Sequence, residues 1–157
     1  MSSPRRLRAA SLLGLLVAAW LVAACGTIST TPPAATPADF QGIFTEFAKR
    51  GIEVDSSVAG DAGCPDTALT PTAIAFTAKG LDQAQPVRIY LYIFGDREAF
   101  ERLRASIDTC ARSYVTDAET FESIEASPFV VAGQGPWAPQ FDAALREGLT
   151  VAAGTGG

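Results

Sequence analysis

Residues 87–95 read VRIYLYIFG, a stretch that alternates with the two-residue period of a β-strand. One face of such a strand carries aliphatic side chains, those of Val87, Ile89, Leu91 and Ile93. The other face carries larger and partly polar side chains, those of Arg88, Tyr90, Tyr92 and Phe94. A single strand is not stable alone, so the chain must supply partner strands and a core that covers at least one of these faces.

Three further segments have the composition of strands. Residues 52–60 (IEVDSSVAG) alternate, and residues 72–80 (TAIAFTAKG) are apolar, with LDQAQP at 81–86 predicted as the following turn. Residues 120–126 and 129–133 are predicted to form a fourth strand, interrupted at Ser127–Pro128. The short connections between the first three strands favour antiparallel pairing.

Three helices are predicted from apolar stripes of helical period. The first covers residues 38–50 and ends at Gly51, and the second starts after Asp96, a residue type that caps helix N-termini well. Pro136 and Trp137 open the third. Their stripes are, in order, Phe40, Ile43, Phe44 and Phe47; Phe100, Leu103, Ile107, Cys110 and Tyr114; and Trp137, Phe141, Leu145 and Leu149.

The element order is therefore α-β-β-β-α-β-α, which predicts an α+β domain at residues 38–153. We expect a four-stranded, mainly antiparallel sheet with the helices packed on one face. Residues 154–157 are expected to be a flexible tail.

The N-terminal residues have the anatomy of an export signal. Arg5, Arg6 and Arg8 precede an apolar run at 9–24, and small residues lie just before Cys25. The run has 16 residues, fewer than the roughly 20 that span a bilayer. Export through the general or the twin-arginine pathway remains open, because the arginine pattern fits the latter only loosely.

The sequence Val22-Ala23-Ala24-Cys25 resembles the lipobox of bacterial lipoproteins. The resemblance implies that residues 1–24 are a cleaved signal peptide and that the sulfur of Cys25 carries a lipid. Residues 25–37, rich in Pro and Thr, would then be a tether between the membrane and the domain. The stretches GDAGC, YLYIFGDREAFERL and SPFVVAGQGPW also resemble small envelope lipoproteins with no assigned activity, which implies a location outside the cytoplasmic membrane.

With Cys25 assigned to lipid, Cys64 and Cys110 remain. An even pair in an exported protein favours a disulfide, which would close a loop worth about 4 kcal/mol in the chain-entropy model. The alternative is two buried free thiols. The charge of the mature chain is acidic: removing the three N-terminal arginines from 12 basic residues leaves nine, against 17 acidic ones, for a net charge of −8. An acidic domain argues against nucleic acid as a partner.

Few residues suggest a reaction. The chain has no histidine, which excludes Ser-His-Asp and Cys-His arrangements, and we expect no cofactor and no metal. Glu53 and Asp55 share a strand face and are the basis of an alternative hypothesis, a small carboxylate-based hydrolase of the envelope. Asp61 and Asp66 could ligate calcium, but the EF-hand pattern is absent.

The remaining candidate is a binding surface. If helices cover the aliphatic face of residues 87–95, then Arg88, Tyr90 and Tyr92 lie on a solvated face, next to Glu53 and Asp55. Tyr and Arg are enriched in interfaces, so this face predicts a binding or structural module for an envelope protein or a small ligand. The alternative is that the tyrosines only pack across strands or lie under a loop.

Overall fold

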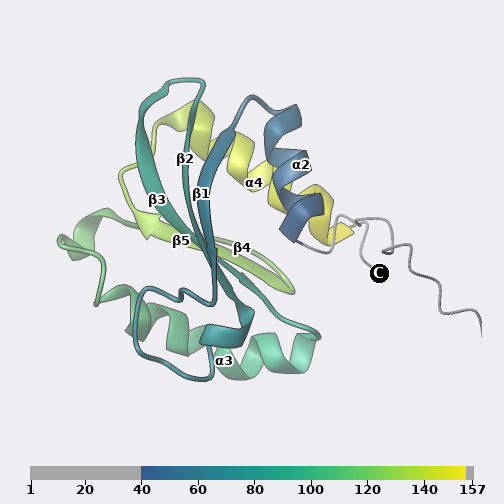
Figure 1. The fold of residues 1–157 in the computed structure, drawn as a ribbon, viewed down its shortest axis with the longest axis vertical. Coiled ribbons are helices and arrows are strands. Elements are labelled where there is room, and N and C mark those ends of the chain that lie inside the picture. The colour runs from purple at the N-terminus through teal and green to yellow at the C-terminus, as the bar shows by residue number, and fades with distance from the viewer. Residues whose placement is uncertain (1–39, 155–157) are drawn as a thin grey trace, which may run out of the picture. The chain divides into compact units, whose positions relative to one another are not determined.

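The structure, a computed structural model, describes residues 40–154, in which five strands form one antiparallel sheet (Figure 1). The elements are, in chain order, α2 (Phe40–Lys49), β1 (Glu53–Ala59), β2 (Ala73–Gly80), β3 (Gln83–Ile93), α3 (Arg97–Ala111), β4 (Phe121–Ala126), β5 (Phe129–Gln134) and α4 (Pro139–Gly154). The predicted signal peptide, the lipidation site Cys25 and the tether lie outside the described residues.

The sheet has the strand order β1-β2-β3-β5-β4, and every neighbouring pair is antiparallel. The prediction of four strands was therefore one strand short. The segment interpreted as one interrupted strand is a hairpin, because the chain reverses at Ser127–Pro128 and Ala126 pairs with Phe129. β5 then lies between β4 and the central strand β3.

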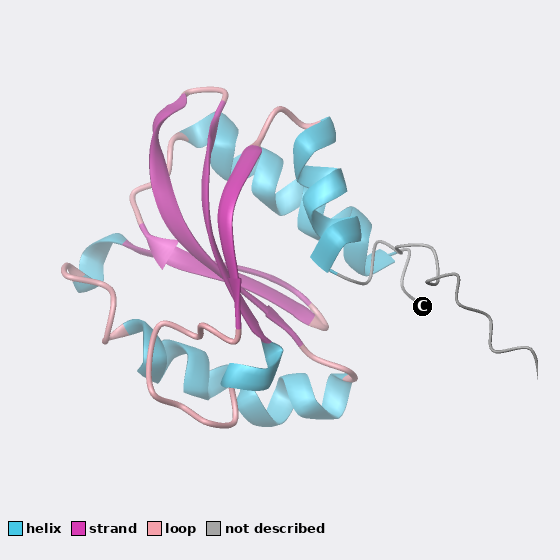
Figure 2. Ribbon diagram, in the orientation of Figure 1, coloured by secondary structure: helices cyan, strands magenta, loops and turns pink. Residues whose placement is uncertain are grey.

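The helices lie on both faces of the sheet, not on one face as predicted (Figure 2). α2 and α4 pack on the face that carries Ile89 and Leu91, and α3 packs on the face that carries Tyr90 and Tyr92. The connection from Gly60 to Thr72, here named the cover loop, also packs on the α3 face through buried side chains. Both faces of β3 are apolar enough to need covering, which is why one layer of helices does not suffice.

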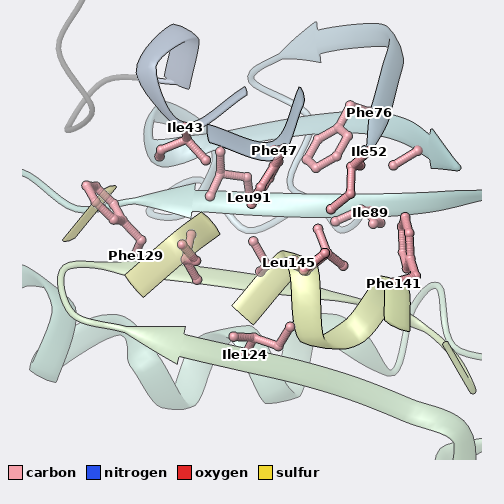
Figure 3. Packing of buried hydrophobic residues seen from close by; sticks show 14 of the residues in the cluster. Ile43, Phe47, Ile52, Phe76, Ile89, Leu91, Ile124, Phe129, Phe141 and Leu145 are labelled. Carbon is pink, nitrogen blue, oxygen red and sulfur yellow. The ribbon is translucent and has the colours of Figure 1, made fainter. Parts of the chain in front are cut away.

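The larger core lies between the sheet and the pair α2 and α4 (Figure 3). Ile43 and Phe47 of α2 and Leu145 of α4 are fully buried against Ile89 and Leu91 of β3. Burying each such side chain contributes about 1.5–3 kcal/mol. The predicted stripes of the first and third helices are thus confirmed as core positions, except that Phe44 is only half-buried and Phe40 remains 39% exposed.

The start of α4 is fixed by the turn between β2 and β3. Both carboxylate oxygens of Asp82 accept hydrogen bonds from this helix, one from the backbone N–H of Gln140 and one from that of Phe141, each at 2.9 Å. This cap places the first helical residue at Pro139, three residues after the predicted start. The predicted turn at 81–86 is also shorter, because Gly80 pairs with Gln83 and β3 begins there.

The N-terminus of α3 agrees with the sequence. The side chain of Asp96 accepts a hydrogen bond of 2.7 Å from the backbone N–H of Ala99, as the capping prediction required. Ile107 and Cys110 are buried on the stripe that faces the sheet. This stripe places Cys110 beneath the cover loop.

Candidate functional site

The tyrosine face that the sequence predicts as a binding surface is covered. Tyr90 is 8% exposed and Tyr92 is fully buried, beneath α3 and the cover loop. The prediction of a solvated aromatic face is wrong, and the alternative that a loop covers it is correct. The physical reason is that two aromatic rings and neighbouring small residues of β2 form an apolar surface that the cover loop removes from water.

The cover loop is attached to this face by a hydrogen bond and an ion pair. The Tyr92 hydroxyl donates to the backbone carbonyl of Ala62 at 2.9 Å, and Arg88 pairs with Asp61 at 2.8 Å. Gly63 has a φ of +76°, and a Cβ at this position would lie 2.4 Å from the ring of Tyr114. Glycine thus lets the loop backbone pack directly on the tyrosine cluster.

The loop is also attached covalently. Cys64 and Cys110 form a disulfide, with 5.4 Å between their Cα atoms, which confirms the predicted pairing. The Cys110 sulfur lies 2.9 Å from the Ala62 carbonyl oxygen, and this is a contact without a hydrogen, because a disulfide sulfur carries none. The disulfide therefore ties α3 to the loop across the buried tyrosines.

Burial also changes the acidity of these tyrosines. It raises the pKa of the Tyr92 phenol, and it raises the pKa of Tyr114 to about 12. Tyr90 and Tyr114 stack with their ring centroids 4.2 Å apart. The cluster is therefore a neutral, packed part of the core.

The predicted carboxylates lie at the edge of the sheet. Asp55 of β1 and Arg88 of β3 both pair with Thr77 of β2, so the three residues form one row across these strands. Arg88 pairs with Asp61, however, and Glu53 pairs with Lys79 at 3.1 Å. The structure therefore brings Asp55 and Arg88 into one row but does not join the five predicted residues into one exposed surface.

The two aspartates considered for calcium serve the loop backbone. Asp61 accepts from the N–H of Gly63 at 2.9 Å, and Asp66 accepts from the N–H groups of Ala68 and Leu69. Within residues 40–154, no three His, Cys, Asp or Glu side chains come close enough together to hold a metal ion.

A groove of about 600 Å³ lies beside the C-terminal end of α3 and the start of β4, and we name it the α3–β4 groove. Ala111, Val115 and Phe121 supply its apolar lining. The polar side chains that line it are those of Asp108, Arg112 and Thr116. Its volume and its mixture of apolar surface with a few polar groups are typical of sites for small molecules.

The charges around the α3–β4 groove are unequally partnered. Arg104 contacts Asp108 at 2.7 Å and also pairs with Glu125 of β4. Burial alone would lower the pKa of Arg104, but the hydrogen bonds to both carboxylates outweigh it and raise that pKa. Asp108 is thus already neutralised by a neighbour on its own helix.

Arg112 is the exception among the basic residues between positions 40 and 154. Eight of the nine basic residues between positions 40 and 154 have a carboxylate oxygen within 4.0 Å: Lys49, Arg50, Lys79, Arg88, Arg97, Arg102, Arg104 and Arg146. Arg112 has none in that part of the chain. The sequence analysis missed this residue, and the only signal available to it was the position of Arg112 at the end of an amphipathic helix.

Comparisons with known protein families, with curated protein sequences and with solved structures gave no match. Between residues 40 and 154, no helix combines the length and the apolar character that crossing a bilayer requires.

Proposed function

We propose that the chain is an exported, lipid-anchored binding module of the cell envelope. The anchor is the thioether of Cys25, within the lipobox-like sequence Val22-Ala23-Ala24-Cys25. The disulfide between Cys64 and Cys110 supports this proposal, because such bonds persist in oxidising compartments outside the cytoplasm.

The proposed binding site is the α3–β4 groove, which replaces the sheet face predicted from sequence. One observation carries this proposal: the groove combines an apolar lining with the guanidinium of Arg112, which has no carboxylate partner among residues 40–154. A small molecule with an apolar body and one anionic group satisfies both features. Its apolar part is removed from water when it packs against Val115 and Phe121, and its anionic group pairs with Arg112.

Two dyes test the site, because they share an aromatic body and differ in one sulfonate. The anionic dye is 1-anilinonaphthalene-8-sulfonate and the neutral one is N-phenyl-1-naphthylamine. We expect Arg112→Ala to weaken binding of the anionic dye about 1.4- to five-fold, as an exposed ion pair is worth about 0.2–1 kcal/mol. Binding of the neutral dye should not change.

The matched control is Arg102→Ala, which removes an exposed arginine from the same helix outside the groove. Near-ultraviolet circular dichroism checks that each variant keeps native packing, because partly folded proteins also bind these dyes. If both variants lose equal affinity for the anionic dye, or if Arg112→Ala loses none, the groove is not an anion site.

The anchor has a separate test. Cys25→Ser should move the protein from the membrane fraction to the soluble fraction, and labelled fatty acid should enter the wild type only. A wild-type chain that takes up no label, or that retains Met1 at its N-terminus, refutes lipidation without bearing on the groove.

A further inference from the structure

A second groove, of about 780 Å³, runs between α2 and the free edge of the sheet. Phe44, Thr45 and Ala48 of α2 form one wall, and residues 51–57 form the other. We name it the α2–β1 groove. It is separate from the α3–β4 groove, because it lies at the opposite edge of the sheet and on elements that line no part of the first groove.

Within the part of the chain that the structure describes, the strand beside this groove has an unpaired side. β1 is the first strand in the order β1-β2-β3-β5-β4, so among residues 40–154 only β2 pairs with it. Six of its seven residues are exposed, and Val54 is half-buried. A strand at the edge of a sheet offers a row of backbone donors and acceptors, which another extended chain can use.

We propose that the α2–β1 groove receives an extended, basic segment of another protein, which pairs with β1 as a sixth strand. The apolar side chains of that segment would pack on Phe44 and Ala48. Its basic side chains would meet Glu53 and Asp55, which are the only charged residues lining the groove among those the structure describes. Asp55 has no basic group within 4.0 Å among the described residues, and residues 25–157 carry a net charge of −8.

The same charges argue against a second copy of this chain as the occupant. Two β1 edges paired antiparallel about Val54, within the regular part of the strand, would place Glu53 of each copy opposite Asp55 of the other. Like charges directly opposite one another destabilise a strand pair. A basic partner converts this repulsion into attraction.

The geometry of β1 also limits the register of the added strand. The pairing of β1 with β2 shifts between Asp55 and Val58, where Ser56 has a φ of +52°. A bulge of this kind bends the strand and interrupts a regular ladder. The segment would therefore pair with residues 52–55, before the bulge.

The probe is a fluorescent, acetylated eight-residue peptide of alternating lysine and valine, titrated against the full chain and followed by anisotropy. Its controls are the same peptide with glutamate in place of lysine and one with a central proline. We expect binding of the lysine peptide only, because the glutamate peptide is repelled and proline lacks a backbone donor. Amide exchange of residues 53–55 should slow in the complex.

Two substitutions with the same change in charge locate the site. Thr45→Lys places a bulky cation in the groove, whereas Thr150→Lys places one on α4. Both threonines are exposed and donate their hydroxyl to the carbonyl four residues earlier. We expect Thr45→Lys to weaken binding of the lysine peptide at least five-fold more than Thr150→Lys does.

Several outcomes would overturn the proposal. They are equal effects of the two lysine substitutions, unchanged amide exchange in β1, or equal binding of the proline peptide. A concentration-dependent dimer in sedimentation that Thr45→Lys abolishes would show that the groove receives a second copy instead.

Discussion

Removal of the disulfide is the perturbation whose size follows most directly from the structure. Cys64 and Cys110 are 46 residues apart in sequence, and their bond closes that loop in the unfolded chain. In the chain-entropy model a loop of this length contributes about 4 kcal/mol to the free energy of unfolding. A domain of this size has a total free energy of unfolding of about 5–15 kcal/mol, so the double variant Cys64→Ala/Cys110→Ala should still fold but be less stable.

Local contacts decide whether the native structure survives the change. The cover loop keeps its hydrogen bond from Tyr92 to Ala62 and its ion pair between Arg88 and Asp61. Leu69 of the same loop is fully buried. These contacts do not need the disulfide, so the loss should appear mainly as a more favourable unfolded state.

The assay is urea unfolding followed by far-ultraviolet circular dichroism, in a Cys25→Ser background so that no third thiol interferes. With an m-value of about 2 kcal/mol/M, the midpoint should fall by about 2 M. Reducing the parent protein should shift its midpoint by a similar amount, and the reductant should not affect the double variant. A loss below about 1 kcal/mol would refute the reasoning, because it would mean that the unfolded chain gains little freedom without the link.

Two other predictions test the packing around Phe47 and the buried phenols. Gly148→Ala places a Cβ 2.7 Å from the ring of Phe47. The overpacking costs about 1–3 kcal/mol and should exceed the helix-propensity gain of at most about 1 kcal/mol, so Tm should fall. Gly154→Ala, whose added Cβ meets open space, is the control and should not lower Tm. Burial raises the pKa of Tyr92 and Tyr114, so both favour folding fully below about pH 10 and lose this contribution as the pH rises towards the folded-state values, at about 1.4 kcal/mol per pH unit for each group. Unfolding free energies that stay constant above pH 10 would contradict the burial of these phenols, as would tyrosinate absorbance that develops while the protein is folded.

Local sequence patterns predicted much of this fold because they are set by neighbouring residues. The helix stripes and the cap at Asp96 depend on spacing and residue type, whereas the pairing of Cys64 with Cys110 followed from the cysteine count once Cys25 was assigned to lipid. The hairpin at Ser127–Pro128 was missed because the two short strands around it resemble one interrupted strand when no partner is known. Strand number is a property of pairing across the sheet, which local patterns do not determine.

The burial of the Tyr90 and Tyr92 face beneath α3 and the cover loop was missed for a different reason. Tyr90 and Tyr92 are residue types that suit either an interface or a core, and the neighbouring positions Ala73 and Ala75 on β2 give only a weak apolar signal. Small side chains bury little area each, yet they let a loop approach the sheet closely. The choice between a solvated and a covered face therefore depended on where the cover loop lies, which its turn-rich sequence does not specify.

The candidate ligand site shows how a tertiary contact can override a local rule. Asp108 and Arg112 are four residues apart with the acid first, the order that favours an ion pair on an isolated helix. Asp108 contacts Arg104 instead, because Glu125 on β4 also binds that guanidinium and holds it beside α3. Within residues 40–154, Arg112 is therefore left without a carboxylate partner because β4 lies next to α3. If that account is correct, Glu125→Gln should release Arg104 and allow Asp108 to pair with Arg112. Binding of the anionic dye should then weaken, although no residue that lines the groove has been removed. Unchanged affinity in this variant would show that Arg112 owes its unpaired state to something other than the contact between β4 and α3.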